Sequence, residues 1–377
     1  MARSKENEIT RRSFLARTGQ GIAVANLSGA FLSGAARAAE SVPKTKGWAI
    51  VGLGSLAINQ ILPAFAKCER SRLVALVSGH RDKAERLAAR YGVLEKNIYN
   101  YQNYDSLKDN PEVDVIYIVL PNGMHAEYTI RGHEAGKHVL SEKPMANTPK
   151  DCEAMIAAAK KANRKLMVAY RVRYEPYNRA MIEMARGKAL GPIQVIVADH
   201  GFSIGDPTQW RLKKDLAGGG SLMDIGIYSL QAARYISGEE PVEVTALMYS
   251  SPGDERFKEV EENIIFQLRF PSGVLANCSS SYGYSGQNRY RVMATDGWFE
   301  LEPATYYTNN KMRVRRGNVT EERDLEAKDH FALEMDHMSE CVQEDKEPLT
   351  PGEEGLRDIR IMMAIYEAAR TGKTIRM

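Results

Sequence analysis

Two segments of the sequence carry side chains that together could act on a hydroxyl or carbonyl group. The first is Glu142-Lys143-Pro144, just beyond a predicted strand end, and the second runs from Leu216 to Tyr228. Within the second, Asp224 and Tyr228 are four residues apart and so share one face of a helix. A tyrosine has a pKa of about 10 and needs a nearby cation to serve as a base near neutrality. Lys143 could supply that cation, so we predict that Lys143, Asp224 and Tyr228 form a catalytic group.

Each segment also has a purely structural interpretation, which spacing alone leaves open. A lysine before a proline is commonly a surface residue in a turn. The three glycines at 218–220 permit close backbone approach and a sharp entry into a helix. In that case Tyr228 would be a core residue of a capped helix.

A glycine pattern near the start of the chain predicts a dinucleotide site. Gly52-Leu53-Gly54-Ser55-Leu56-Ala57 follows the apolar run at 48–51 and opens a helix that we expect to reach about Lys67. The first glycine permits a tight turn, the second lets a pyrophosphate approach the backbone, and the small third residue lets helix and strand pack closely. The phosphates would lie at the helix N-terminus. A tight turn without a ligand is the alternative.

The end of the next expected strand, at 73–77, bears on which dinucleotide binds. An NAD site usually has an acidic residue there, which bonds the ribose 2′-hydroxyl. Here Ser78 and Gly79 follow, and then His80, Arg81 and Lys83. A hydroxyl and cations would accept a 2′-phosphate that an acid would repel. We therefore predict a preference for NADP, with a solvated charged turn as the alternative.

These motifs lie in a chain whose two parts differ in pattern. Up to about residue 170, continuous apolar strands alternate with helices, which predicts a parallel, doubly wound sheet. The expected strands there are 48–51, 73–77, 113–119 and 138–140, with helices at 83–91, 125–135 and 149–162. From residue 193 onward polar–apolar alternation indicates a largely antiparallel sheet with one packed face, with strands at 194–200, 242–250, 261–270, 274–281 and 289–295 and helices at 330–343 and 353–369.

The fold class is therefore predicted as α/β, with an N-terminal Rossmann dinucleotide-binding domain and a C-terminal α+β domain that holds a large, mostly antiparallel open sheet. We place the Rossmann domain at 47–170 and the α+β domain, for substrate binding and oligomerisation, at 171–377. A short N-terminal arm at 39–46 precedes them.

Residues 1–38 have the features of an export signal. Arg11-Arg12 precede an apolar stretch from Gly21 to Ala36, and Ala36-Arg37-Ala38 forms a cleavage site of the A-x-A type. An amphipathic helix with a chance arginine pair is the alternative. We expect a twin-arginine signal peptide, a periplasmic protein exported in the folded state, and no membrane anchor, because the stretch is too short and weakly apolar to span a bilayer.

Composition limits the remaining classes. The 377 residues carry 51 Lys and Arg against 48 Asp and Glu, a net charge of +3. The first 38 residues account for +4, so the rest is close to neutral and no broad nucleic-acid surface is expected. The four cysteines, Cys68, Cys152, Cys278 and Cys341, fit no metal pattern. Isolated buried thiols are expected, and the alternative is a single disulfide across the fold.

From about Gly47 to Ile375 the sequence resembles the Gfo/Idh/MocA oxidoreductase family, and within it the periplasmic glucose–fructose oxidoreductase branch. The segments that carry the resemblance are 51–65, 75–84, 120–128, 135–146, 209–228 and 350–360. The broad family usually has His where Tyr228 stands, and the Tyr variant is similar to this branch. The chain stops at Met377, where the branch has a longer tail, so a dimer is as well supported as a tetramer.

The resemblance implies NADP(H) that is bound tightly and not released, oxidation of an aldose at C1 to the lactone, and reduction of a second sugar to the alditol by ping-pong hydride transfer. It implies that Tyr228 is the acid/base, that Lys143 lowers its pKa, and that Asp224 orients the sugar. The residues assigned to the cofactor are Gly52, Gly54, Ser55, Leu56, Ala57, Ser78, Gly79, Lys83, Tyr101, Leu120, Pro121, Asn122, His125, Glu142, Lys143, Arg171, Trp210 and Arg211. The residues assigned to the substrate are Lys143, Tyr174, Asp224, Tyr228 and Tyr290.

Two other functions stay open at the level of the sequence. One is an NADP-dependent aldose dehydrogenase whose cofactor exchanges, and the other is a non-enzymatic sensor of nucleotide or sugar. The residues at 201–207 leave glucose, xylose and arabinose open as substrates, with an aldose–aldose reaction preferred to one that requires fructose. The catalytic group argues against the sensor. His125 could equally be a helix cap.

Overall fold

The computed structural model describes residues 45–377. The predicted signal peptide at 1–38 lies outside them, as do residues 39–44 of the predicted arm. Among the described residues no helix is both long and apolar enough to cross a membrane.

The first part of the described chain forms a six-stranded parallel sheet in the order β3-β2-β1-β4-β5-β6. Its strands are β1 (Lys46–Val51), β2 (Ser71–Val77), β3 (Ile98–Tyr99), β4 (Val115–Ile118), β5 (His138–Glu142) and β6 (Leu166–Ala169). The parallel, doubly wound sheet is thus confirmed. The two-residue β3 and the four-residue β6 were not predicted, because short apolar runs give no periodicity from which to identify a strand.

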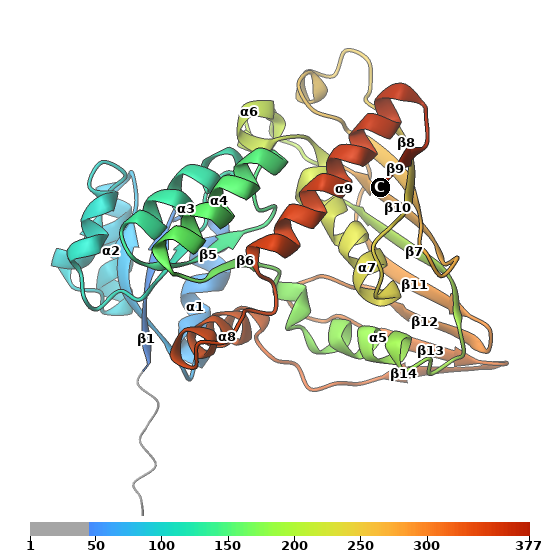
Figure 1. The fold of residues 1–377 in the computed structure, drawn as a ribbon, viewed down its shortest axis with the longest axis horizontal. Coiled ribbons are helices and arrows are strands. Elements are labelled where there is room, and N and C mark those ends of the chain that lie inside the picture. The colour runs from blue at the N-terminus through green and yellow to red at the C-terminus, as the bar shows by residue number, and fades with distance from the viewer. Residues whose placement is uncertain (1–44) are drawn as a thin grey trace, which may run out of the picture. The chain divides into compact units, whose positions relative to one another are not determined.

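Helices cover both faces of this sheet (Figure 1). The apolar core on one face includes α3 (His125–Glu134) and α4 (Pro149–Ala162). On the other face it includes α1 (Leu62–Ala64), α2 (Arg81–Tyr91) and α8 (His330–Gln343). Helix α8 comes from the far end of the chain, and its Ser339 accepts a hydrogen bond of 3.0 Å from the Trp48 indole of β1. The first sheet therefore depends on residues near the C-terminus.

Local signals explain why some helices match their predicted bounds and one does not. Helix α4 begins after Thr148, whose hydroxyl accepts from the Asp151 amide, and ends at Asn163 in the left-handed conformation. After the glycine loop, the expected helix is instead a π-helical turn (Ala57–Ile61), the short α1 and a 3₁₀ turn (Phe65–Lys67). Pro63 lacks an N–H, so a regular α-helical ladder cannot run through this segment.

The second sheet has nine strands in the order β14-β13-β12-β11-β7-β10-β9-β8-β15. All neighbours are antiparallel except β7 and β10. The strands are β7 (Ile193–Gly201), β8 (Glu243–Tyr249), β9 (Asn263–Arg269), β10 (Leu275–Ser281), β11 (Gln287–Ala294), β12 (Gly297–Leu301), β13 (Met312–Arg316), β14 (Val319–Arg323) and β15 (Ile375–Arg376). The mostly antiparallel sheet is confirmed; β12 to β15 were not predicted.

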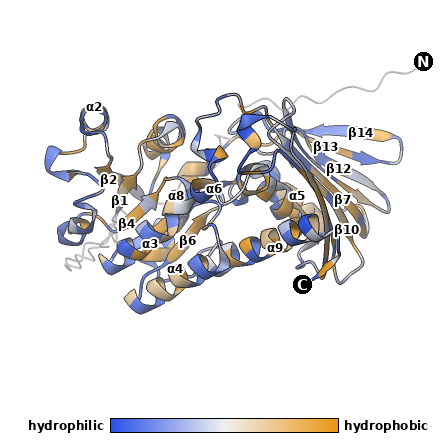
Figure 2. Cartoon of the chain, turned by 90° about the horizontal axis from the view of Figure 1, so that it is seen from above, coloured by the Kyte–Doolittle hydropathy of each residue, from blue (hydrophilic) through white to orange (hydrophobic). Residues whose placement is uncertain are grey.

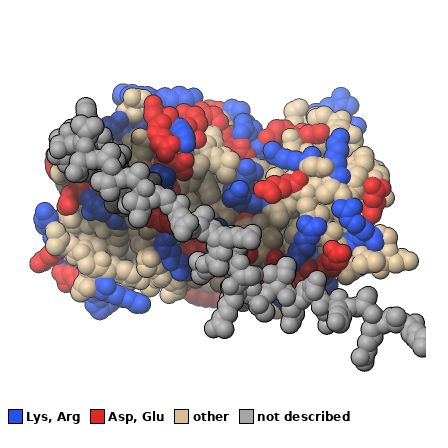
Figure 3. Space-filling view, turned by 90° about the horizontal axis from the view of Figure 1, so that it is seen from below, with Lys and Arg blue, Asp and Glu red and all other residues tan. Residues whose placement is uncertain are grey.

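One face of this sheet carries helices and the other carries none among the described residues (Figures 1 and 2). The covering helices are α5 (Pro176–Arg186), α7 (Ile227–Ser237) and α9 (Gly352–Thr371), and the short α6 (Lys214–Ala217) leads into the segment before α7. Along β9 buried and exposed residues alternate, as expected for a sheet with one packed face. On the molecular face in Figure 3, basic and acidic side chains are interspersed. The four cysteines are free thiols.

Candidate active site

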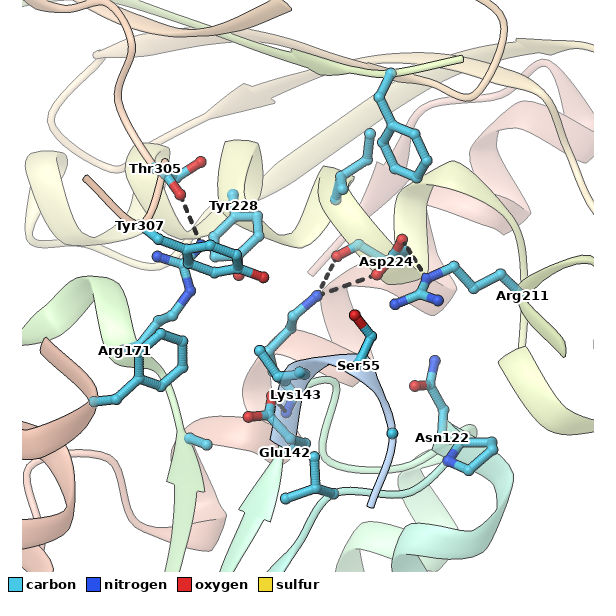
Figure 4. A pocket seen from close by; sticks show the side chains of 18 of the residues that line it. Ser55, Asn122, Glu142, Lys143, Arg171, Arg211, Asp224, Tyr228, Thr305 and Tyr307 are labelled. Atoms are coloured by element: carbon cyan, nitrogen blue, oxygen red, sulfur yellow. Dashed lines mark hydrogen bonds and ion pairs between the residues drawn. The ribbon is translucent and has the colours of Figure 1, made fainter. Parts of the chain in front are cut away.

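A cavity of about 1350 Å³ lies where the carboxyl ends of the first sheet's strands meet the second sheet, and residues of both sheets line it. Ligands of open α/β sheets bind at this edge of the strands. Figure 4 shows side chains of the cavity wall, with Lys143 and Glu142 from one side and Asp224, Tyr228 and Arg171 around them.

The glycine loop has the geometry that a pyrophosphate requires. Gly52 has φ +94°, and a Cβ there would lie 2.3 Å from the Val119 carbonyl oxygen, so only glycine fits. A Cβ at Gly54 would meet nothing within 4 Å, which leaves its backbone open to the cavity. Ser55 and Leu56 also line the cavity. The backbone of the loop can therefore approach a dinucleotide closely, because no side chain lies between them.

Ala57 does not reach this space, contrary to its assignment as a cofactor contact. It is fully buried in the core below α1 and does not line the cavity. The π-helical turn that begins at Ala57 directs its methyl group toward the sheet. Its small size therefore serves helix–strand packing.

The residues after β2 form the part of the cavity where the 2′-phosphate is expected. Ser78, Gly79, His80, Lys83 and Tyr101 all line it, and no acidic side chain of this turn does so. The Ser78 hydroxyl accepts from the His80 amide at 3.1 Å, and Lys83 Nζ donates to the Leu53 carbonyl at 3.4 Å. Arg81 is turned away, toward Glu85 and Glu95. The residues that line this part of the cavity are therefore consistent with the predicted preference for NADP, whose ribose carries a 2′-phosphate.

Lys143 and Asp224 meet across the two sheets. Lys143 Nζ lies 3.3 Å from Asp224 Oδ1 and donates to the Asp224 carbonyl oxygen at 2.5 Å. The other carboxylate oxygen accepts from Arg211 Nε at 3.0 Å and from the Tyr282 hydroxyl at 3.1 Å. The lysine and aspartate side chains are only 14% and 15% exposed. Asp224 therefore holds both cations in place, and its predicted role in orienting a sugar stays a prediction.

The charges of this cluster keep its members ionised. Burial alone would raise the pKa of Asp224, but Arg211, Lys143 and the Tyr282 hydrogen bond lower it to about 2. Burial alone would lower the pKa of Lys143, but Tyr228, Asp224 and Glu142 together raise it. Lys143 is thus an ammonium over the whole physiological range.

Tyr228 lies between cations. Lys143 Nζ is 5.0 Å from the centroid of its ring, and the Arg171 guanidinium carbon is 5.3 Å from it. Both distances are within the range of cation–π attraction. Asp224 belongs to a π-helical turn (Leu222–Gly226) and Tyr228 to α7, and both face the cavity. The prediction that Lys143, Asp224 and Tyr228 come together is therefore met in the geometry.

His200 of β7 is a neighbour of Tyr228 that the sequence did not reveal. Its ring lies 5.7 Å from the Tyr228 ring, and its nitrogens hydrogen-bond the hydroxyls of Ser229 and Thr305 at 2.8 and 3.2 Å. Burial and the charges of Arg171 and Lys143 lower the pKa of His200 to about 3. A neutral imidazole therefore backs the tyrosine.

Arg171 connects this region to a loop that follows β12. Its Nη2 donates to the Thr305 carbonyl at 2.7 Å, and its guanidinium lies 4.7 Å from the Tyr307 ring (Figure 4). The loop from Pro303 to Lys311 lines the cavity, and no sequence motif marked it. A cluster of tyrosine, threonine and asparagine between two strands is the signal that could have indicated it. The cavity residues missed from the sequence include His200, Phe202, Gln209, Ile225, Gln287, Asn288, Pro303, Thr305, Tyr306, Tyr307, Thr308, Asn309, Lys311 and Phe331.

Most of the other predicted contacts line the cavity: Leu120, Pro121, Asn122, Glu142, Arg171, Trp210 and Arg211. Asn122 uses its side-chain amide to donate to the Ala217 carbonyl at 2.8 Å. It thereby ties the β4 loop to the glycine segment before α7.

Three further predicted residues do not reach the cavity. His125 is fully buried, and its two ring nitrogens hydrogen-bond the Leu120 and Pro144 carbonyl oxygens. It fixes the loops that carry Asn122 and Lys143 rather than a ligand. Tyr174 and Tyr290 were assigned to the sugar, and both are buried elsewhere.

Tyr174 packs against His337 of α8, with ring centroids 5.4 Å apart, and lines a separate groove. Tyr290 lies behind His200, and its hydroxyl donates to the Asn178 side chain. Neither tyrosine lines the cavity, so their assignment to the sugar has no support from this geometry and stays a prediction.

Comparison with known proteins agrees with this geometry. A model of the oxidoreductase family with an NAD-binding Rossmann fold (GFO_IDH_MocA) matches residues 46–170, and a GFO/IDH/MocA C-terminal domain model matches 178–300. An aldose–aldose oxidoreductase from Caulobacter crescentus, solved with glycerol, is 51% identical with a TM-score of 0.87, covering 89% of this chain and 100% of that chain.

Two more distant relatives extend the comparison. D-xylose 1-dehydrogenase [NADP(+)] from Haloarcula marismortui is 33% identical over 340 residues, which cover 88% of this chain and 92% of the relative. A 3-ketoreductase from Actinomadura kijaniata, solved with NADP and TDP-benzene in an open conformation, is 25% identical with a TM-score of 0.74, covering 87% and 98% of the two chains. The chain is therefore an enzyme of the GFO/IDH/MocA oxidoreductase family.

Proposed function

We propose that this oxidoreductase retains NADP(H), oxidises an aldose at C1 to the aldonolactone, and reduces a second sugar to the alditol in the same cavity. The observation that carries the proposal is Tyr228 held between Lys143 and Arg171, in the cavity that the glycine loop opens onto. The relatives named as an aldose–aldose oxidoreductase and a D-xylose dehydrogenase support sugars as substrates.

The chain's own groups provide the acid–base part of this reaction. Lys143, fixed by Asp224, presents an ammonium beside the Tyr228 ring and stabilises negative charge on the phenol oxygen. In the oxidation Tyr228 accepts the proton of the sugar hydroxyl, and in the reduction it returns a proton to the acceptor's carbonyl oxygen. Bound NADP supplies the hydride acceptor for the first sugar and, once reduced, the donor for the second. The glycine loop and the turn after β2 would hold it.

Retention of the cofactor is supported by the expected location. The twin-arginine signal predicts export of a folded protein to the periplasm, where little free nicotinamide nucleotide is available to exchange. A cofactor carried out with the protein has to be reoxidised in place, and a second sugar does this. The periplasmic location and the retention of NADP(H) are therefore parts of one proposal, because the first is the reason for the second.

The test uses purified protein with no added nucleotide. An aldose is added, and the near-ultraviolet absorbance of reduced nicotinamide is followed. One equivalent per chain, reversed by a second sugar, is the expected result. Reduction only after NADP is supplied would contradict retention and indicate an exchanging dehydrogenase, which the name of the Haloarcula relative favours as second candidate. Absence of reduction even then would contradict the assignment to aldoses.

The cofactor preference can be changed at Ser78. Aspartate there retains an acceptor for the His80 amide but places a negative charge at the wall of the cavity. We expect Ser78→Asp to lower the ratio of NADP to NAD found with the protein about tenfold or more, since like charges repel. The nucleotides released on denaturation are separated and quantified. Ser78→Ala is the control, and an unchanged ratio in the aspartate variant would place the 2′-phosphate elsewhere.

We also propose a homodimer through the uncovered face of the second sheet. Leu247 and Ile265 are directly opposed on β8 and β9 and are 72% and 52% exposed, an unusual density of apolar side chains for a free surface. Ile265→Glu is expected to convert the oligomer to monomers in sedimentation velocity runs. Leu94→Glu, at an equally exposed site away from this sheet, should not. A monomeric parent protein would end this part of the proposal.

A further inference from the structure

A buried carboxyl group behind the cavity has no role in the reaction described so far. Glu334 lies in the first turns of α8 and is 0% exposed, and neither of its carboxyl oxygens has a hydrogen-bond partner. Its helix neighbours Phe331, Met335 and Met338 belong to the apolar core beneath the first sheet. An ionised carboxylate without hydrogen bonds is very costly in such surroundings, whereas a protonated one is not.

Tyr117 links this region to the cavity wall. Its side chain on β4 is fully buried, and its hydroxyl donates to Glu142 Oε1 at 2.7 Å. Glu142 Oε2 accepts from the backbone amide of Lys143 at 3.2 Å. A hydroxyl that donates one hydrogen bond can still accept another, and acceptance strengthens its donation. The Tyr117 hydroxyl is among the groups that act on Glu334, so a protonated Glu334 could donate to it although no hydrogen bond is formed in this structure.

The charged and titratable groups that act on Glu334 come from three other elements. Burial raises its pKa well above the usual value, the charge of Glu142 on β5 adds to this, and Arg171 and the Tyr117 hydroxyl oppose it. Tyr174, which follows the same turn as Arg171, has its own pKa raised by burial and by the charge of Glu334. These influences, taken with the missing hydrogen bonds, favour the neutral acid.

We propose that Glu334 is a positioning residue that stays protonated and, through the Tyr117 hydroxyl, keeps the Glu142 carboxylate ionised at the wall of the cavity. The consequence for the site lies in Lys143. The negative charge of Glu142 contributes to the raised pKa of Lys143 and anchors its backbone. The effect on catalysis rests on the proposed function; the protonation of Glu334 does not.

Isotope-edited infrared spectroscopy of the full chain with labelled glutamate tests the protonation directly. The parent at neutral pH should show the carbonyl stretch of a protonated carboxylic acid, and Glu334→Gln should lose it. Glu300→Gln is the matched control, because Glu300 is equally buried but ion-paired to Arg291 and Arg313, so it should lose a carboxylate band instead. A protonated band that persists in Glu334→Gln would overturn the proposal.

The pH profile of nicotinamide reduction by an aldose tests the connection. Tyr117→Phe removes a donor from Glu142 and should move the acid limb upward by about one pH unit. Glu334→Leu should move it in the same direction, whereas Glu334→Gln, whose amide can still donate, should leave it in place. Because Glu334 acts through Tyr117, the double variant Tyr117→Phe/Glu334→Leu should shift no further than Tyr117→Phe alone. Additive shifts, or equal shifts in the Gln and Leu variants, would contradict the link.

Discussion

Tyr228→Phe is expected to lower turnover by ~10²–10⁴-fold, the range for loss of an acid–base group. The ring stays between Lys143 and Arg171, so the packing is kept and only the proton acceptor is lost. Single-turnover reduction of the bound nicotinamide by an aldose measures the chemical step without product release. The amount of nucleotide carried by the protein should not change, because Tyr228 lies outside the glycine loop.

Tyr306→Phe provides the comparison for that variant. Tyr306 lines the same cavity, and the substitution removes the same hydroxyl, but Tyr306 is half-exposed on the loop after β12. Its substitution should alter turnover only slightly. Near-normal single turnover in Tyr228→Phe would remove the tyrosine from the acid–base role, and a loss of nucleotide would show that it acts through cofactor binding instead.

The second large effect is expected for Asp224→Asn, which affects both stability and rate. One carboxylate accepts from Lys143, Arg211 and Tyr282, and an amide leaves two cations facing a single acceptor. Breaking a buried ion pair costs about 3–5 kcal/mol, and the lower end applies because Arg211 is about a third exposed. Turnover should fall as well, since Lys143 loses the group that holds it beside Tyr228. Denaturant unfolding and single-turnover rates measure the two effects.

The difference in stability between the parent and Asp224→Asn should depend on pH in a defined direction. Asp224 has a pKa of about 2 in the folded protein, below the value of about 3.9 for an unfolded chain. Its ionised form therefore stabilises the fold above about pH 4, and this stabilisation is lost as the pH falls toward 2. The difference in the free energy of unfolding between the parent and Asp224→Asn should be constant from neutral pH to about pH 5 and shrink below pH 4. Asp199→Asn, at a pair with Arg289 on the second sheet, controls for loss of an ordinary ion pair; equal losses of rate in both variants would contradict the role of Asp224.

The sequence predicted the parts of the site that local rules determine. The glycine loop could be assigned because a strand, a turn that needs positive φ and a helix start follow each other within a few residues. Lys143 could be placed because parallel strands end at the same edge of a sheet. Asp224 and Tyr228 could be paired because helical spacing puts them on one face, and the π-helical turn between them did not separate them.

The parts of the cavity that the sequence did not place depend on long-range packing. Tyr174 follows a turn and Tyr290 lies on β11, and their burial against α8 and α5 depends on contacts between segments far apart in the chain. His200 and the loop from Pro303 to Lys311 come from a sheet whose order brings β7 and β11 together at the cavity. Strand order cannot be read from alternation, so the sequence pattern did not place these residues at the cavity. The parallel pairing of β7 and β10 was missed for the same reason.

Helix α8 has a consequence for how the chain folds during synthesis. A nascent chain normally completes its N-terminal domain before later segments leave the ribosome. Here the part of the apolar face around Trp48 that α8 covers, beside α1 and α2, remains exposed until residues 330–343 have been made. The nucleotide-binding part is therefore completed last although it is translated first.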